Sequence, residues 1–370
     1  MDVRWKRRIM LIAGVLLSAA ALGFFVFKLR GHWRQVAGSL ARANYLYVVP
    51  AVAFIAIMYA LRIVRWRLFL KPLGQIPYRH ITSSTLIGFM STCVLPLRAG
   101  EIIRPYLLSR KTGLHFGHAA GTDLGLGRVF DIIGSCFLIF LALSLLPAAP
   151  GRNAAPAADS GTSAAQTVQA EDADGPDWQA QLRAQAPWLA GVALTGILGM
   201  LAVALKPDLM LRVLRFLLRP LPEAWAQALL KFSDSVIQSL GFLKNPGQFT
   251  AGVALTLAIW FCYPVSTWSL ARGFGLELPF GGAVLVQVLI TLAVALPQAP
   301  SFLGVFQVAA MAGVGLYGVD KGPAGAFATM LWIINVVPIT VVGLGVLWWE
   351  GLSLRVLAEE SREAAAETEE

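Results

Sequence analysis

Residues 324–349 read AGAFATMLWIINVVPITVVGLGVLWW, a run without a charged residue. A helix needs about 20 mainly apolar residues to cross the hydrocarbon core of a bilayer, so this stretch predicts a membrane-spanning helix. Runs of similar character recur along the rest of the chain. The predicted spans are 9–28, 45–61, 124–146, 188–205, 249–271 and 324–349. The sequence therefore predicts an all-α, polytopic membrane helical bundle of about six full spans.

The composition of the whole chain excludes several other classes of protein. Hydrophobic residues make up 57% of the 370 residues and charged residues 14%, whereas ordinary globular domains contain about 25% charged residues. The apolar runs also lack the short alternating segments of a membrane β-barrel. The net charge of +9 comes from basic residues between the runs, so no separate basic domain is present to bind nucleic acid. Cys93, Cys136 and Cys262 lie inside apolar runs and indicate neither a disulfide framework nor a metal site.

Basic clusters between the spans predict the orientation of the chain, because Lys and Arg accumulate on the cytoplasmic side. The N-terminal run is longer than a typical cleaved signal, which favours an uncleaved anchor with its N-terminus in the cytoplasm. The acidic tail, 351–370, is expected in the cytoplasm as well. The expected cytoplasmic clusters are Arg4, Lys6, Arg7 and Arg8; Arg62, Arg65, Arg67 and Lys71; and Lys206, Arg212, Arg215 and Arg219.

Two segments outside the spans divide the chain. Residues 147–187 are rich in Ala, Gly and Ser and carry acidic side chains, which predicts a disordered, non-cytoplasmic linker. This linker separates a first membrane half, 1–146, from the span at 188–206 and a second membrane half, 245–350. Residues 207–244 alternate basic and apolar positions, a pattern typical of amphipathic helices that lie in the cytoplasmic interface.

Two apolar runs, 81–97 and 280–296, each end in a Leu-Pro pair and are expected to form broken or re-entrant hairpins. In the first, Arg98, Glu101 and Arg104 have the spacing of one helical face. The prolines around them predict irregular backbone, which at membrane depth is tolerated only inside protein or beside a hydrated cavity. The alternative is a cytoplasmic loop with solvated salt bridges. The helix breaks predicted here are Pro96, Gly100 and Pro105.

The second run continues as Leu296-Pro297-Gln298-Ala299-Pro300-Ser301-Phe302-Leu303-Gly304-Val305-Phe306-Gln307. Helix breaks at corresponding places in two halves are typical of transporters built from repeats. With the predicted orientation the two runs enter from opposite sides of the membrane, so they could form an inverted repeat. A simple helix–turn–helix without a ligand is the alternative. The predicted breaks are Pro297, Pro300 and Gly304, and the polar residues beside them are Gln298, Ser301 and Gln307.

A third candidate element is the segment 121–131, in which Arg128 and Asp131 would share a helical face inside an apolar run. An unpaired charge at the bilayer centre costs about 2.5–3.5 kcal/mol on insertion scales, so pairing or a hydrated cavity is expected. Glycines in the segment would let a neighbouring helix approach closely. A purely structural ion pair is the alternative.

Catalytic and metal-binding motifs give little support for an enzyme. His115 and His118, with Asp123 nearby, could ligate a metal, but their surroundings favour a cytoplasmic turn. The sequence also lacks a Ser-His-Asp arrangement, a Cys-His arrangement and a phosphate-binding glycine loop. No metal, cofactor or catalytic residue is therefore predicted.

At these positions the chain resembles the lysylphosphatidylglycerol synthase transmembrane-region family, a group of flippase-like membrane proteins. The matching features are Arg98-Ala99-Gly100-Glu101-x-x-Arg104, Arg128-x-x-Asp131, and Pro300 with Gly304, and the resemblance extends over about residues 5–350. It implies lipid handling, since well-understood members couple such a membrane region to a soluble aminoacyl transferase. The chain ends soon after its last predicted span, so no transferase domain and no lysyl transfer are expected.

Two departures from the family pattern concern carboxylates. Many relatives have Glu before Arg128, where this chain has Gly127. Many also have a Gly-Gly-x-Gly-x-x-Glu pattern after the second proline, where this chain has Phe302-Leu303-Gly304 and Gln307. Both departures remove a carboxylate, which argues against proton coupling through these sites.

The expected function is translocation of an anionic lipid, or of a polyprenyl-phosphate-linked glycan, across a bacterial inner membrane. Arg98 and Arg104 would bind the phosphate, because guanidinium groups suit bidentate recognition of oxyanions, and Glu101 would orient them. Gln298, Ser301 and Gln307 would add polar contacts to the substrate, and Asp123, Arg128 and Asp131 would form a gate or relay.

Two alternatives from other classes stay open. The first is a membrane partner of a lipid or cell-envelope glycan biosynthetic enzyme, docked through residues 207–244. The second is an integral-membrane transferase that uses Glu101 or Asp131 as a base.

Overall fold

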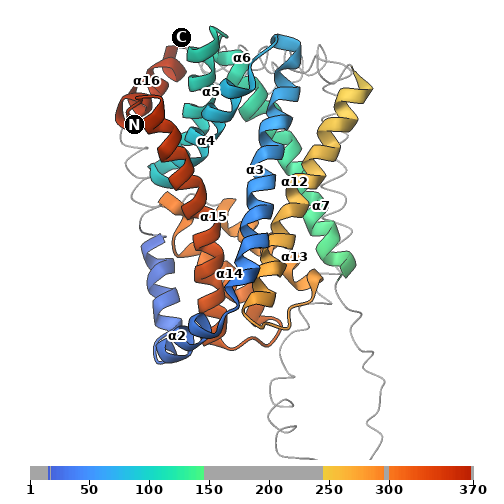
Figure 1. Cartoon of the computed structure of the whole chain (residues 1–370), viewed down its shortest axis with the longest axis vertical. Helices are drawn as coiled ribbons and strands as arrows, with labels where there is room; N and C mark the ends of the chain where they lie inside the picture. The colour runs from blue at the N-terminus through green and yellow to red at the C-terminus, as the bar shows by residue number, and fades with distance from the viewer. Residues whose placement is uncertain (1–15, 17, 146–244, 296–299, 368–370) are drawn as a thin grey trace, which may run out of the picture.

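The protein is a bundle of helices running mostly along one axis (Figure 1). The computed structural model describes residues 16, 18–145, 245–295 and 300–367. Within these ranges four helical stretches are long and apolar enough to cross a membrane, with mean hydropathies between 1.5 and 2.2. They are Tyr45–Leu73, Phe116–Leu145, Pro246–Gly273 and Lys321–Trp349.

These four stretches correspond to four of the predicted spans. Of the predicted span 9–28, the shorter apolar helix Ser18–Lys28 is described. The span predicted at 188–205, the linker 147–187 and the amphipathic segment 207–244 lie outside the described residues. The domain boundaries drawn from the sequence therefore stay predictions.

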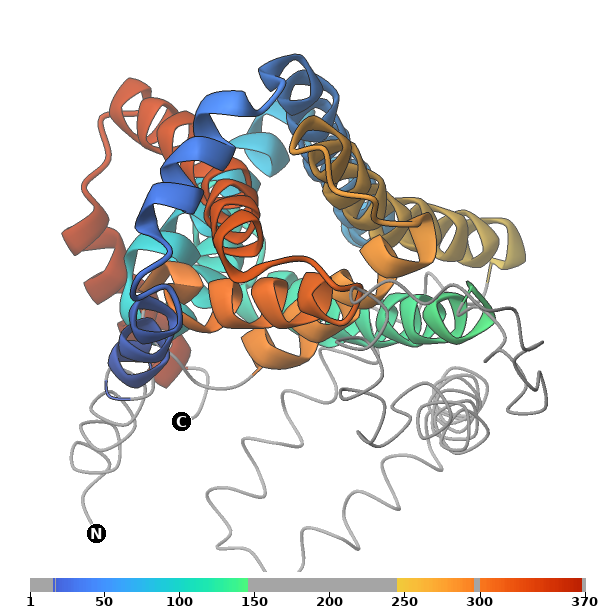
Figure 2. The same ribbon diagram turned by 90° about the horizontal axis from the view of Figure 1, so that it is seen from below.

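The long helices form the frame of the bundle. They are α3 (Val48–Leu70), α7 (Gly127–Leu145), α12 (Pro246–Gly273) and α15 (Lys321–Trp349). At a rise of 1.5 Å per residue, α3 is about 34 Å long, which matches a hydrocarbon core of about 30 Å. α3 packs along α12, and Figure 2 shows the two side by side on one flank of the bundle.

The predicted end of the second span was wrong. α3 continues beyond residue 61 to Leu70, and it carries Arg62 and Arg65 inside the bundle. Their side chains are only 13% and 6% exposed, so these two residues do not belong to a solvated cytoplasmic cluster. The helix can continue because a carboxylate on α7 neutralises part of the buried charge.

Two helical hairpins enter the bundle from opposite ends (Figure 1). The first consists of α4 (Tyr78–Val94), the 3-10 turn η3 (Pro96–Arg98) and α5 (Gly100–Thr112). The second consists of α13 (Phe280–Ala295), the 3-10 turn η7 (Pro300–Phe302) and α14 (Val305–Gly315).

The tips of the two hairpins meet. The Ser301 hydroxyl donates to the carbonyl of Cys93 at 2.7 Å, and Arg98 donates to the carbonyl of Val294 at 2.5 Å. In the described part of the chain, the only non-glycine residues with positive φ are Arg98 (52°), Ser301 (62°) and Phe302 (58°). All three lie in the tips, so the backbone strain of the described fold is concentrated where the hairpins meet.

The first hairpin depends on close packing at glycine. A Cβ atom on Gly100 would lie 2.0 Å from the carbonyl oxygen of Gly88 and 2.3 Å from Oγ1 of Thr92. The break is shorter than predicted, since Pro105 lies buried in the interior of α5 and does not interrupt it. The helix tolerates this proline because it loses a single backbone donor there, so the assignment of Pro105 as a break was wrong.

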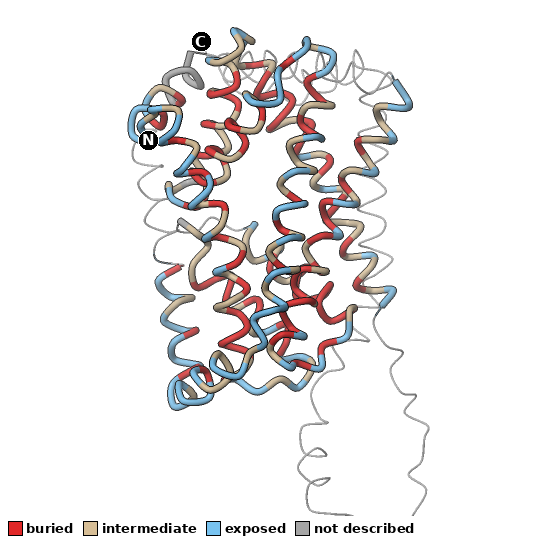
Figure 3. Tube along the Cα trace, in the orientation of Figure 1, coloured by how far each residue is buried: buried red, intermediate tan, exposed pale blue. Residues whose placement is uncertain are grey.

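Shorter helices close the two ends of the bundle. α2 (Trp33–Arg42) packs against α15 at one end, and α16 (Leu354–Glu367) packs against α5 at the other. Figure 3 shows buried residues on the sides of the helices that face the interior. The outer faces carry exposed apolar side chains, among them Phe140, Val341 and Trp348. Such a surface suits contact with lipid.

Candidate functional site

A cavity of about 510 Å³, with charged side chains set in a largely apolar wall, lies between the tips of the two hairpins and is also lined by α3, α7, α12 and α15. Apolar side chains such as Phe89, Ile132, Phe302 and Phe306 form part of its wall. Its charged residues come from α3, α7, the first hairpin and the turn before α7. They are Arg62, Arg65, Arg98, Glu101, Arg104, Asp123, Arg128 and Asp131.

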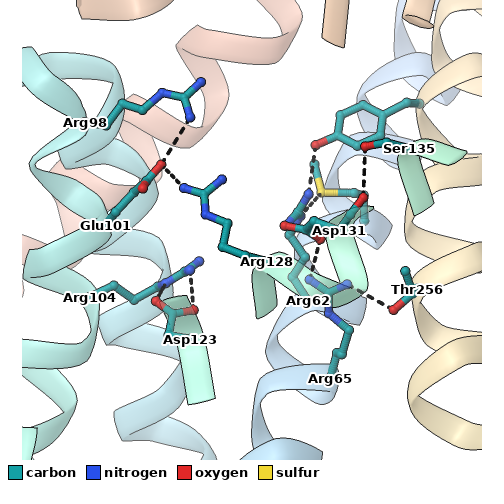
Figure 4. Close-up of polar contacts among 12 residues, drawn as sticks. Arg62, Arg65, Arg98, Glu101, Arg104, Asp123, Arg128, Asp131, Ser135 and Thr256 are labelled. Carbon is teal, nitrogen blue, oxygen red and sulfur yellow. Dashed lines mark hydrogen bonds and ion pairs between the residues drawn. The ribbon is translucent and has the colours of Figure 1, made fainter. Parts of the chain in front are cut away.

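The first charged cluster joins the tip of the first hairpin to α7. Glu101, in the first turn of α5, forms an ion pair with Arg128 and lies 3.4 Å from Arg98 (Figure 4). The side chains of Arg98, Glu101 and Arg128 are 33%, 27% and 46% exposed, so this is the accessible part of the site. One carboxylate is shared by two guanidinium groups.

The second cluster joins α3 to α7 and is more deeply buried. Asp131 contacts Arg65 at 2.8 Å and Arg62 at 3.6 Å. Arg65 also donates to Thr256 on α12, and Arg62 donates to the hydroxyl of Tyr263 on the same helix. Again two guanidinium groups share one carboxylate.

The third group is a neutral pair. Arg104 on α5 donates two hydrogen bonds to the carboxylate of Asp123, whose side chain is 6% exposed. The guanidinium also lies over the ring of Phe89, 4.7 Å from its centroid. Both charges are therefore compensated inside the protein, as a buried pair requires.

Asp123 lies in a π-helical turn. α6 (Phe116–Ala120) runs into the π-helical segment η4 (Gly121–Leu126), which continues directly into α7. Such turns are rare and occur frequently at functional sites. Within this segment Thr122 is fully buried and accepts a hydrogen bond from the Trp66 indole.

The described lining of the cavity has an excess of positive charge. It contains five arginines and three carboxylates, which leaves a formal charge of +2. The two clusters contribute one unit each, and the Arg104–Asp123 pair contributes none. The site can therefore attract an anion without an additional cofactor.

The structure brings together six of the charged residues singled out in the sequence. Arg98, Glu101 and Arg104 line the same cavity as the three residues predicted to form a gate or relay. Arg128 and Asp131 do not form the mutual ion pair that was the alternative interpretation of the sequence, because each contacts a residue from another helix. The gate residues Asp123, Arg128 and Asp131 therefore belong to three separate ion-pair groups.

Sequence reasoning missed two site residues, Arg62 and Arg65. They share a helical face at a spacing of three residues, directly after an apolar run. That spacing was the available signal, and a cytoplasmic cluster has the same appearance in sequence.

Ser301 and Gln307 of the second hairpin were predicted to contact a substrate. The structure shows them bound to other parts of the protein. The Gln307 side chain is 3% exposed and accepts a hydrogen bond from the backbone of Gly304, which caps α14. Ser301 bonds to the first hairpin, and its own carbonyl accepts from Trp332. Neither side chain lines the cavity. Pro297 and Gln298 lie outside the described residues.

The glycine and proline breaks of the second hairpin are placed as expected. The backbone of Pro300 is in the 3-10 turn η7, and Gly304 has a φ of +86°. A Cβ atom on Gly304 would lie 2.5 Å from the backbone nitrogen of Leu22. The N-terminal helix Ser18–Lys28 therefore supports this break.

The glycines near Arg128 act differently from the prediction. A Cβ atom on Gly127 would meet only its own segment, at Thr122 and Asp123. The close helix approach on α7 is about two turns further along, at Gly134, where a Cβ would lie 2.0 Å from the Trp260 ring on α12.

The histidines near this segment take part in local structure. His115 accepts a hydrogen bond from the backbone of Gly117 and so caps α6. Asp123 is bound to Arg104. Across residues 16, 18–145, 245–295 and 300–367 there is no group of three or more His, Cys, Asp or Glu side chains that could hold a metal ion.

Comparison with known proteins identifies the chain at the level of a family. The family model described as the lysylphosphatidylglycerol synthase TM region matches residues 11–343. No curated protein and no solved structure matches the chain. The match covers both hairpins, every charged residue of the cavity and the apolar helices up to residue 343 in α15. This identifies an integral membrane protein of the flippase-like, lipid-biosynthesis type. The chain belongs to the lysylphosphatidylglycerol synthase transmembrane-region family.

Proposed function

We propose that this protein translocates an anionic lipid, or a lipid-linked glycan, between the leaflets of a bacterial inner membrane. The observation that carries the proposal is the arginine-rich cavity between hairpins that enter from opposite ends of the bundle. A phosphate that crosses a bilayer must replace its hydration, and guanidinium groups in a polar cavity provide that replacement. A site between two re-entrant tips can open towards either leaflet through movement of one hairpin at a time.

In this proposal Arg98 and Arg128 bind the phosphate of the lipid. They are the most exposed arginines of the cavity, and they share one carboxylate. Glu101 holds their guanidinium groups until an anion enters. Arg104 was the second phosphate ligand expected from the sequence, but its bidentate contact with Asp123 favours a positioning role at the base of the hairpin.

The more deeply buried cluster, Arg62 and Arg65 with Asp131, adds to the positive electrostatic potential of the cavity. Arg62 and Arg65 are held by Asp131, Thr256 and Tyr263. Their net positive charge attracts the same anion from a greater depth. The aromatic and aliphatic residues of the wall are assigned contact with the first carbons of the lipid stem.

The orientation follows from the basic residues at the two ends. We place the end that carries α6 and α16 in the cytoplasm, as the positive-inside rule favours, because Arg110 and Lys111 lie in the last turn of α5 and Arg67 and Lys71 lie at the end of α3. The basic cluster at residues 4–8 is the sequence feature that supports a cytoplasmic N-terminus in this proposal.

Transport can be measured directly with the full chain in liposomes. Fluorescent phosphatidylglycerol or prenyl phosphate, placed in both leaflets, should become fully accessible to an external quencher only when the protein is present. Arg98→Ala should lower the initial rate at least about tenfold, because it removes a charge-assisted contact. Arg355→Ala is the matched control, since Arg355 is 88% exposed on α16 and far from the cavity in sequence.

The same experiment separates the alternatives. A membrane partner without transport activity would leave the inner leaflet protected. A transferase would convert a lipid in detergent, where no second leaflet exists. Full transport by Arg98→Ala would remove the basis of the assignment.

A further inference from the structure

We infer that the headgroup taken up by the cavity carries two negative charges, as a phosphate monoester or a diester of diphosphate does above about pH 7. This inference rests on the proposed function and narrows its substrate class. The first step is the formal charge of +2 on the described lining. A dianion neutralises this charge completely, whereas a phosphodiester with one charge leaves an uncompensated unit in the interior.

The second step is the distribution of the charge. Each excess unit belongs to a separate cluster in which two arginines share one carboxylate. The two clusters meet on α7, where Arg128 and Asp131 are three residues apart and therefore neighbours on one helical face. A headgroup with two charges balances the excess of both clusters, whereas a headgroup with a single charge balances only one unit.

The third step disfavours zwitterionic and cationic headgroups. An ammonium group needs a carboxylate whose charge is not already balanced. Glu101, Asp123 and Asp131 each contact at least one arginine already. In the described lining no other Asp or Glu is present to receive an ammonium group.

The substrate class can be tested by binding to the wild-type chain in detergent. The probes share one prenyl tail and differ in the head: prenol, a prenyl methyl phosphodiester, prenyl phosphate and a prenyl methyl diester of diphosphate. At pH 8 the phosphate monoester is a dianion, since its second pKa is about 6, and the diester of diphosphate carries one charge on each phosphorus. These two dianions should bind about tenfold more tightly than the phosphodiester, and prenol should bind weakest.

Variants test whether the clusters cause the preference. Arg128→Gln and Arg62→Gln each lower the excess to one unit, and in both variants the shared carboxylate keeps one arginine, so folding should persist. Each variant should bind the dianionic and monoanionic heads within about threefold of each other. Arg355→Gln should keep the wild-type preference.

The outcomes separate this inference from the transport proposal. Preferential binding of dianions by a protein that moves no lipid would support the inference and contradict the proposed function. Transport and binding with equal affinity for all charged heads would contradict the inference and leave the proposed function intact. If the variants fail to fold, the binding of the headgroup series to the wild-type chain still tests the preference for two charges.

Discussion

The carboxylate of Glu101 forms an ion pair with Arg128 and also lies 3.4 Å from Arg98. This arrangement connects the first hairpin to α7 across the cavity. Two guanidinium groups compete for one carboxylate, so neither is fully neutralised. The contact is therefore poised to be replaced by an incoming phosphate.

Glu101→Gln should increase affinity for an anionic lipid and slow its transport. The change raises the formal excess on the described lining from +2 to +3, and it removes the group that competes with the phosphate for both arginines. Binding of prenyl phosphate in detergent should tighten about tenfold, while the transport rate in liposomes should fall because release becomes slower. Glu359→Gln, on the exposed face of α16, is the control. Weaker binding by Glu101→Gln would show that this carboxylate contributes directly to recognition.

Asp123→Asn should destabilise the fold strongly. It leaves Arg104 buried beside Phe89 without its counter-ion, and removal of one partner from a buried pair costs about 3–5 kcal/mol. The measurement is the free energy of unfolding, or the melting temperature, in detergent. The double variant Arg104→Met with Asp123→Leu should recover a large part of the loss. Equal stability of Asp123→Asn and the wild type would mean that the pair is dispensable.

Arg98→Gly should be more stable than Arg98→Ala, although both should lose transport. Arg98 has a φ of +52°, a left-handed conformation that costs a residue with a Cβ about 1–2 kcal/mol. Glycine removes this strain, whereas alanine keeps it. The difference between the melting temperatures of the two variants measures the effect of backbone strain. The liposome assay measures the loss of transport, which should be the same in both because both lack the guanidinium group. A more stable alanine variant would indicate that the tip does not hold this conformation.

Gly100→Ala should open the first hairpin. The added methyl group would overlap the carbonyl of Gly88 and the hydroxyl of Thr92, so α4 and α5 must separate, at a cost of about 1–3 kcal/mol. Gly345→Ala on α15 is the matched control, because nothing lies within 4 Å of the new methyl group there. The expected result is a lower melting temperature and slower transport for Gly100→Ala, with neither change for the control. Normal behaviour of Gly100→Ala would contradict the close α4–α5 packing.

Local signals in the sequence were sufficient to predict the broken helices and much of the cavity. Pro96 and Pro300 restrict the backbone wherever they lie, and the charges that follow Pro96 have no place in lipid. The tertiary partners were not predictable in the same way. Arg65 reaches Asp131, 66 residues further along, so its burial depends on a contact that no local pattern contains.

The polar residues of the second break show a different limit. Ser301 and Gln307 could have faced a ligand or the backbone. Gln307 accepts from the backbone of Gly304 in its own break. Ser301 donates to the carbonyl of Cys93 near the end of α4 in the first hairpin. Pro105 shows the same limit for helix ends, since a proline within a helix costs one backbone hydrogen bond that surrounding protein can offset.

The π-helical turn at Gly121–Leu126 determines which side chains face the cavity together. In a regular α-helix Asp123 and Arg128 would point about 140° apart, because each residue advances about 100°. The wider turn brings positions five residues apart closer to one face, so both side chains line the same cavity. Removal of a single residue from this turn would restore the tighter winding and swing Asp123 and the upstream helix out of phase with α7. A one-residue deletion here should therefore disconnect the acid that holds Arg104 from the arginine that contacts Glu101, without changing the composition of either helix.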